Sequence, residues 1–170
     1  EFIEECNRKI PYQIMDEGLY FDDFGDSEKA LGKYIKARSR VMTNDTLILE
    51  SLNFRINEIA RKWLNSAELL LDRGFHKDGL DLVKKVSSFY NIEDKIINKF
   101  KSYVVLEEGK KLQSILILGK AMEKYSEALK LNTDLESNVK ALQYQAGIQL
   151  VELANKVDAF DEINLAVQSL

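Results

Sequence analysis

Apolar residues recur along this chain at intervals of three and four, the spacing that places side chains on one face of an α-helix. The spacing is clearest between Lys62 and Val86. The residues that form it there are Trp63, Ala67 and Leu70, then Gly74, then Gly79, Val83 and Val86. A glycine between two such stripes is typical of a helix end followed by a reversal. The stretch therefore predicts two helices that fold back on each other around a tight turn at Gly74.

The same arrangement recurs, so the sequence predicts four helical hairpins, at about residues 11–44, 60–92, 102–133 and 136–170. Each hairpin has a small residue, a large apolar residue and a turn position, followed on the return helix by a small, a bulky and an apolar residue. The other three sets are Gly18, Phe21, Gly25, Ala30, Tyr34 and Ala37; Gly109, Leu112, Leu116, Ala121, Tyr125 and Ala128; and Gly147, Leu150, Ala154, Ala159, Ile163 and Ala166. The small residues are expected to let the two helices approach closely, with Phe21 and Tyr34 filling the space around them.

Capping and turn signals divide these elements. Asp26 or Ser27 can cap one helix, Thr43-Asn44-Asp45 precedes a long helix over 46–73, and Asn91–Asp94 precedes another. Thr133 to Glu136 has the Thr-x-x-Glu form of a capping box. Two readings stay open between Leu112 and Gly119, either a tight reversal near Gly119 or one unbroken helix. A turn is expected at 155–158. Because no segment alternates with a period of two, the predicted fold is all-α.

The ensemble of small and bulky positions resembles the tetratricopeptide (TPR) family, in which small residues seat the two helices of each hairpin together. Trp63 falls on the aromatic position of that family near the start of the first helix. The chain departs from the family in two respects. The first small residue recurs at 18, 67, 109 and 147, in steps longer than the roughly 34 residues of a standard repeat, and the usual proline at the end of each unit is absent.

The resemblance implies one domain over 1–170 in which the hairpins stack as a right-handed superhelix. Stacked hairpins of this kind leave an extended concave surface, where members of the family hold a peptide or a helix of a partner protein. Carried onto this chain, the resemblance places the partner-binding residues at Leu64, Asn65, Glu68, Asp72, Lys110, Gln113, Tyr144, Gln145 and Ile148, within a lining that also includes Val151. Of the positions where the family has lysines and asparagines that grip a terminal carboxylate, only Lys110 has one of these residues, and Leu64, Glu68 and Tyr144 are among the others, so a mixed apolar and acidic groove is expected.

Composition narrows the classes of partner. The 24 basic and 28 acidic residues give a net charge of −4, which provides no field to attract nucleic acid. Basic residues do cluster over 33–40 and 95–101, and solvated helix faces are the simpler interpretation of both clusters. Cys6 is the only cysteine, which excludes an internal disulfide, and no apolar run is long enough to cross a bilayer.

Little in the chain indicates catalysis. His76 is the only histidine and follows the Gly74 turn, where a surface side chain is the simpler interpretation. Asp22, Asp23 and Asp26 crowd another turn, but their spacing does not match a calcium-binding loop. Phosphate-binding, dinucleotide-binding and zinc-protease motifs are absent from the sequence. We therefore predict no catalytic residue, no metal and no cofactor.

Three functional hypotheses follow. The preferred one is a non-enzymatic module that binds another protein and scaffolds a complex. The alternatives are a helical nucleic-acid-binding regulator and an enzyme with dispersed carboxylates, for which the sequence offers no positive sign. The Ile-, Lys- and Asn-rich composition resembles that of proteins from AT-rich bacterial genomes such as those of spirochaetes, and the first residue is Glu1 rather than Met. These two features suggest an envelope or periplasmic location, with the cytoplasm as the alternative.

Overall fold

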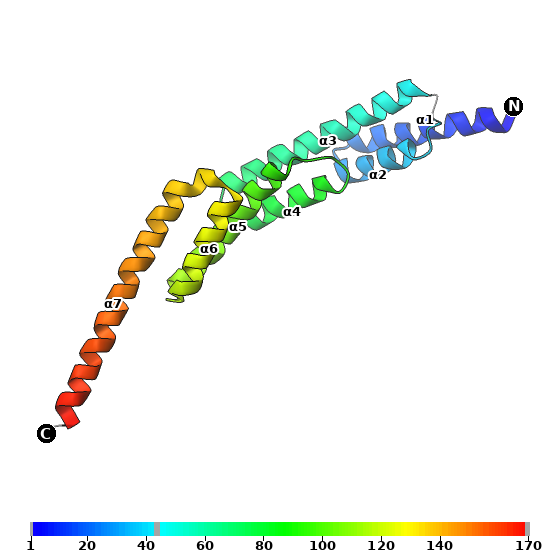
Figure 1. The fold of residues 1–170 in the computed structure, drawn as a ribbon. Coiled ribbons are helices and arrows are strands. Elements are labelled where there is room, and N and C mark those ends of the chain that lie inside the picture. Colours follow the sequence, from blue (N-terminus) through cyan, green and yellow to red (C-terminus); the bar gives the residue numbers. More distant parts are fainter. Residues whose placement is uncertain (1, 43–44, 169–170) are drawn as a thin grey trace. The chain divides into compact units, whose positions relative to one another are not determined.

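Helices account for all the regular secondary structure in the part of the chain that the structure describes. The structure is a computed structural model that describes residues 2–42 and 45–168, with side chains over 9–42 and 45–158. The elements are α1 (Phe2–Asp23), α2 (Ser27–Arg38), α3 (Thr46–Asp72), α4 (His76–Ser87), α5 (Asp94–Ser114), α6 (Leu118–Leu131), a 3-10 turn η1 (Thr133–Leu135) and α7 (Glu136–Gln168) (Figure 1). The predicted all-α class is confirmed, and sequential helices pack in pairs that are close to antiparallel.

Contacts between Cα atoms group the chain into two compact units. One comprises Glu1–Leu69 with Leu82–Asn91, and the other Leu70–Asp81 with Ile92–Leu170. The hairpin of α1 and α2 therefore belongs to the first unit and that of α5 and α6 to the second, whereas α3 and α4 each contribute residues to both. The stacking of all hairpins into one domain with a right-handed superhelix stays a prediction.

The first unit is held together where α1 and α2 pack against the beginning of α3. Its core includes Ile14 of α1, Tyr34 of α2, and Leu52 and Ile56 of α3, all buried. A β-carbon built on Gly18 would lie only 2.5 Å from Cε1 of Tyr34. The prediction that a small residue lets the two helices approach closely is thus confirmed, and the tyrosine ring occupies the space that a larger residue at 18 would fill.

The second unit repeats this contact between α5 and α6. A β-carbon built on Gly109 would lie 2.6 Å from Cε1 of Tyr125, which is fully buried. Leu106 of α5, Ala128 of α6 and Val139 of α7 complete the same apolar cluster. Because the two hairpins were matched from their sequences alone, this shared geometry supports the repeat.

Three turns have the same backbone conformation. Gly25, Gly74 and Leu116 have φ values of +77°, +83° and +62°. At each of these residues, the backbone amide donates a hydrogen bond to the carbonyl three residues earlier. The amide of the following residue donates to the carbonyl five residues before it. For Leu116 and Ile117 both N–O distances are 3.0 Å. This pair of bonds defines a Schellman helix ending. The alternative left open between Leu112 and Gly119 is therefore decided in favour of a reversal, located at Leu116 rather than at Gly119.

The hairpin between α3 and α4 has different residues at the matching positions. Ala67 stands where the other two hairpins have glycine, and Val83 stands where they have tyrosine. Both side chains are fully buried. The larger residue on α3 thus occurs together with a smaller one on α4, so the volume of the two positions changes in opposite directions.

The fourth predicted hairpin is wrong. The structure has a single helix from Glu136 to Gln168, with no turn at 155–158. Ala154 occupies the turn position, and neither glycine nor proline, the strongest signals for a helix end, follows it before residue 159. Leu150 is exposed, contrary to its predicted inner position, and the side chains of 159–170 lie outside the described residues.

The helix starts follow the predictions with local differences. Asp26 caps α2 by accepting a hydrogen bond from the amide of Lys29 at 3.1 Å. At the start of η1 the cap is Asn132, which accepts from the amide of Asp134 at 3.1 Å, so the predicted capping box beginning at Thr133 is wrong. Thr43 and Asn44 lie outside the described residues. Helix α1 begins at Phe2, well before the predicted start of the first hairpin, and includes Pro11.

Candidate functional site

The outward face of α7 is the candidate site, and it depends on how the opposite face of the helix is fixed. Val139 and Ala146 on that opposite face are fully buried, and Leu142 packs against the same apolar cluster. These residues are three or four positions apart, so they form one stripe of the helix. The first half of α7 is therefore held against α5 and α6 of the second unit.

Two hydrogen bonds between side chains reinforce this packing. The Gln113 amide nitrogen on α5 donates to Gln149 Oε1 on α7 at 2.9 Å, and the Gln143 amide donates to the Ser126 hydroxyl on α6 at 3.3 Å. Gln113 also accepts a hydrogen bond from the hydroxyl of Tyr125. A buried amide with both ends satisfied is stabilising, and it fixes the rotation of α7 about its own axis.

With one side of α7 fixed, three apolar side chains of the same helix lie exposed. Tyr144 is 72% exposed, Ile148 43% and Val151 60%. Their spacing of four and then three residues places them on one face, where they form a continuous apolar strip. Gln145 beside them is also exposed. We call Tyr144, Ile148 and Val151 the α7 strip.

The other predicted partner-binding residues divide between the two units. In the first unit, Leu64 and Glu68 are half-buried and Asn65 is exposed on α3. In the second unit, Asp72 and Lys110 are exposed.

Gln113, the remaining predicted residue, is only 8% exposed because it bonds to Tyr125 and Gln149. Its role in the structure is internal. The exposed members of the predicted set that lie closest together in the chain are thus Tyr144, Gln145 and Ile148.

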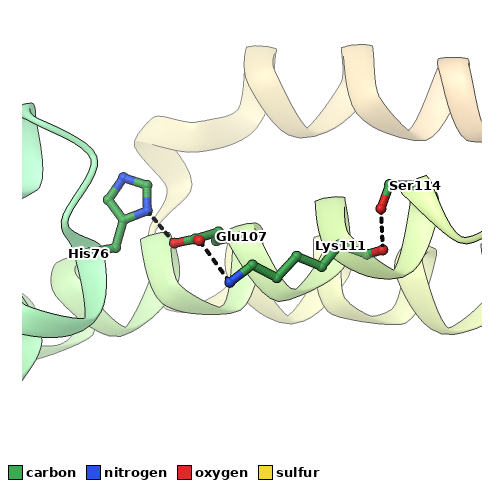
Figure 2. A network of polar contacts seen from close by, with 4 residues as sticks. All are labelled: His76, Glu107, Lys111 and Ser114. Carbon is green, nitrogen blue, oxygen red and sulfur yellow. Dashed lines mark hydrogen bonds and ion pairs between the residues drawn. The ribbon is translucent and has the colours of Figure 1, made fainter.

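His76 belongs to a small polar network inside the second unit (Figure 2). Its Nδ1 lies 3.0 Å from Oε2 of Glu107, and Lys111 Nζ lies 2.9 Å from the other carboxylate oxygen. The hydrogen bond from Lys111 lowers the pKa of the Glu107 carboxyl group most, burial opposes it, and His76 adds a further lowering. The His76 ring also lies 5.5 Å from that of Tyr103. The network links the start of α4 to α5, and His76 is half-buried rather than a freely exposed side chain.

Sequence reasoning missed one feature of α7. Leu153 and Val157 continue the stripe of Val139, Leu142 and Ala146 beyond its packed part. Val157 lies in the predicted turn at 155–158 and Leu153 just before it, yet their spacing of four residues was the available signal.

Two general properties complete the description. Among the residues whose side chains are described, no three or more His, Cys, Asp and Glu are grouped so that they could hold a metal ion. In the same part of the chain, no helix combines the length and the apolar character that crossing a membrane requires.

Comparisons of the chain with family models, with curated proteins and with solved structures found no match.

Proposed function

We propose that this chain is a non-enzymatic interaction module that binds a segment of another protein. The observation that carries the proposal is the α7 strip, three apolar side chains exposed on one face of a helix whose other face is fixed. An exposed apolar strip with this spacing suits an amphipathic helix or an extended peptide of a partner, which would bury it.

The composition of the strip supports such a role. Tyr144 combines a large apolar ring with a hydroxyl group, and tyrosine is enriched among the residues that dominate binding energy at interfaces. Gln145, adjacent to the strip, offers an amide that can donate and accept at its polar rim. Because Gln113 and Gln149 fix the helix from behind, the strip is pre-organised and loses little conformational freedom on binding.

The finer parts of the proposal rest on the resemblance to TPR proteins. In it, the hairpins stack as a TPR-like superhelix, and the resemblance gives Leu64, Asn65 and Glu68 a part in binding as well. The three Schellman turns and the two glycine–tyrosine contacts support a repeated hairpin. The role would be to scaffold a bacterial envelope complex, in the periplasm or at the envelope.

Photo-crosslinking tests the α7 strip directly. The full chain carries p-benzoylphenylalanine in place of Tyr144, or in place of Phe54 as a matched control, since Phe54 is a similarly exposed aromatic residue on α3. Extracts of source cells are irradiated with each protein, and the adducts are identified by mass spectrometry. We expect a protein adduct from position 144 that is absent from position 54.

Affinity measurements with the captured partner then decide the point. The double substitution Tyr144→Ala with Ile148→Ala should weaken binding by at least about tenfold, whereas Phe54→Ala should leave it unchanged. Equal binding of the two variants would refute the strip as the site. A shift of duplex DNA at moderate salt by the wild-type chain would instead support the nucleic-acid-binding alternative.

A further inference from the structure

The turn between α5 and α6 exposes three consecutive apolar residues that have no part in the proposed function. Ile115 is 64% exposed, Leu116 51% and Ile117 42%. We call these three residues the apex, and they lie at the tip of the α5–α6 hairpin (Figure 1). A single exposed apolar residue is common on a protein surface, whereas a contiguous apolar patch is typical of an interaction site.

The backbone of Leu116 gives a second reason to assign the apex a role. Its φ of +62° lies in the left-handed region, where the other two turns have Gly25 and Gly74. A leucine in this conformation costs free energy that a glycine avoids. Burial does not offset the cost, because half of the residue is exposed. Internal packing therefore does not explain the leucine, and strained backbone of this kind is typical of sites that contact a ligand.

The charge around the apex is positive. The segment 109–122 contains no aspartate or glutamate. Its exposed lysines are Lys110 and Lys111 on α5 and Lys120 on α6. Lys111 binds Glu107 of its own helix at 2.9 Å, so we assign the recognition of a partner to Lys110 and Lys120.

These two lysines lie closer to the apex than the carboxylates that flank the segment. Lys110 and Lys120 are about 8 Å and 5 Å from the apex along their helix axes, within the Debye length of about 8 Å at physiological ionic strength. Of the flanking carboxylates, Glu108 binds Lys124 at 3.0 Å, and Glu123 lies beyond Lys120 along α6. The end of the hairpin thus combines an apolar centre with a lysine on each helix.

We propose that the apex inserts into the surface of a lipid bilayer that contains anionic lipids, while Lys110 and Lys120 bind the lipid phosphates. Apolar side chains at the boundary between headgroups and acyl chains supply one part of such binding, and lysines at an anionic surface supply the other. The long lysine side chains reach the phosphates while the apex lies deeper. A protein pocket would accept the apex as well, but it gives no reason for a lysine on both helices.

Flotation of the full chain with lipid vesicles tests the proposal. The vesicles contain phosphatidylcholine alone, or phosphatidylcholine mixed with the anionic lipid phosphatidylglycerol. We expect the chain to bind the mixed vesicles at least about tenfold more strongly than the neutral ones, and to lose this preference in high salt. A chain that binds neither kind of vesicle, or both kinds equally, would overturn the proposal.

Leu116→Gly combined with Ile117→Ser removes apolar side chains of the apex without weakening the fold. Glycine relieves the positive φ at 116, and serine is favoured at 117, the cap position of α6. This apex variant should bind the mixed vesicles at least about tenfold more weakly than the wild type. The matched control, Tyr144→Ala with Ile148→Ala on the α7 strip, should bind them like the wild type. Equal losses from both variants would show unspecific apolar adsorption and would overturn the proposal.

The role of the lysines has a matched test of its own. Lys110→Gln with Lys120→Gln should weaken binding to the mixed vesicles by at least about fivefold. The control, Lys101→Gln with Lys130→Gln, changes the net charge equally at two exposed lysines of the same helices, far from the apex. Equal losses from the two pairs would show attraction by net charge alone, against the proposal.

Fluorescence measures whether the apex enters the bilayer. In a Trp63→Phe background, Ile115→Trp should be quenched by lipids that are brominated on their acyl chains. Phe54→Trp in the same background should not be quenched, since Phe54 is an exposed residue of α3. An unquenched tryptophan at 115 would contradict insertion.

The apex and the α7 strip can fail separately. The apex variant should bind the partner captured through position 144 like the wild type, even where it no longer binds vesicles. Loss of that partner from the apex variant, together with a wild type that binds no vesicles, would show that the apex contacts a protein instead of a bilayer.

Discussion

Replacing Gly109 with alanine tests the contact that organises the second unit. The added β-carbon would lie 2.6 Å and 2.8 Å from Cε1 and Cδ1 of Tyr125, and 3.2 Å from Cβ of Lys124. The tyrosine ring is fully buried and its hydroxyl is bonded to Gln113, so the ring cannot turn aside without losing both its packing and its hydrogen bond. We therefore expect α5 and α6 to be forced apart locally.

Two effects of opposite sign set the size of the change. Alanine is favoured over glycine inside a helix by about 1 kcal/mol, whereas overpacking a close-packed site costs about 1–3 kcal/mol. The net expectation for Gly109→Ala is a loss of about 0–2 kcal/mol. Gly147 of α7 provides the matched control, because a β-carbon built there meets nothing within 4 Å. Gly147→Ala should therefore stabilise the protein by about 1 kcal/mol.

Urea denaturation followed by far-ultraviolet circular dichroism measures both variants. A double-mutant cycle isolates the contact, because Gly109→Ala with Tyr125→Val introduces the residue types that Ala67 and Val83 have at the matching positions of α3 and α4. The cost of Gly109→Ala should fall when valine replaces the ring, giving a coupling energy of about 0.5–3 kcal/mol. The reasoning is refuted if Gly109→Ala stabilises the protein as much as Gly147→Ala does.

Three further predictions follow from the turns and the core. Leu116→Gly should stabilise the protein by about 1 kcal/mol in urea denaturation, since the positive φ is strained for leucine; a lowered midpoint would contradict this. Burial and the nearby Asp22 raise the pKa of Tyr34 from 10.0 to about 12. As pH rises, the Tyr34 hydroxyl therefore loses its proton in the unfolded chain before it does so in the folded one, and the stability of the folded chain should fall between pH 10 and about 12. The thermal midpoint of Tyr34→Phe should fall less steeply over this range than that of the wild type. Trp63→Ala should lower the free energy of unfolding, followed by circular dichroism, by about 2 kcal/mol. This is less than the roughly 3–5 kcal/mol expected for a fully buried ring, because Trp63 is half-buried against Phe89. An unchanged midpoint would show that the ring contributes nothing.

The sequence predicted the first three hairpins because their signals lie within a few residues of one another. Gly25 and Gly74 mark helix ends through a backbone conformation that glycine adopts without strain, and both have positive φ in the structure. Leu116 has no such freedom, and only its place in the repeated pattern indicated a turn. There the packing of Tyr125 against α5 outweighs the local preference.

The same pattern failed in α7 because it contains no signal strong enough to end the helix. Ala154 is a good helix former and stands where the other units have their turn. The candidate site was predicted in part for a related reason. Tyr144 and Ile148 follow from helical periodicity, but the burial of Gln113 depends on hydrogen bonds to residues distant in sequence, which periodicity does not reveal.

The contacts of Gly18 with Tyr34 and of Gly109 with Tyr125 also fix the number of residues between each glycine and the turn that follows it. One residue inserted between Gly109 and Leu116 would rotate the glycine by roughly 100° about the axis of α5, relative to the turn. The tyrosine ring would then meet a bulkier side chain. Insertions between hairpins leave each of these angles intact, and the unequal steps from Gly25 to Gly74 and from Gly74 to Leu116 show that such length differences are accommodated. The part of the hairpin from the glycine through the turn to the tyrosine thus has a fixed length, and length variation is confined to the segments that join one hairpin to the next.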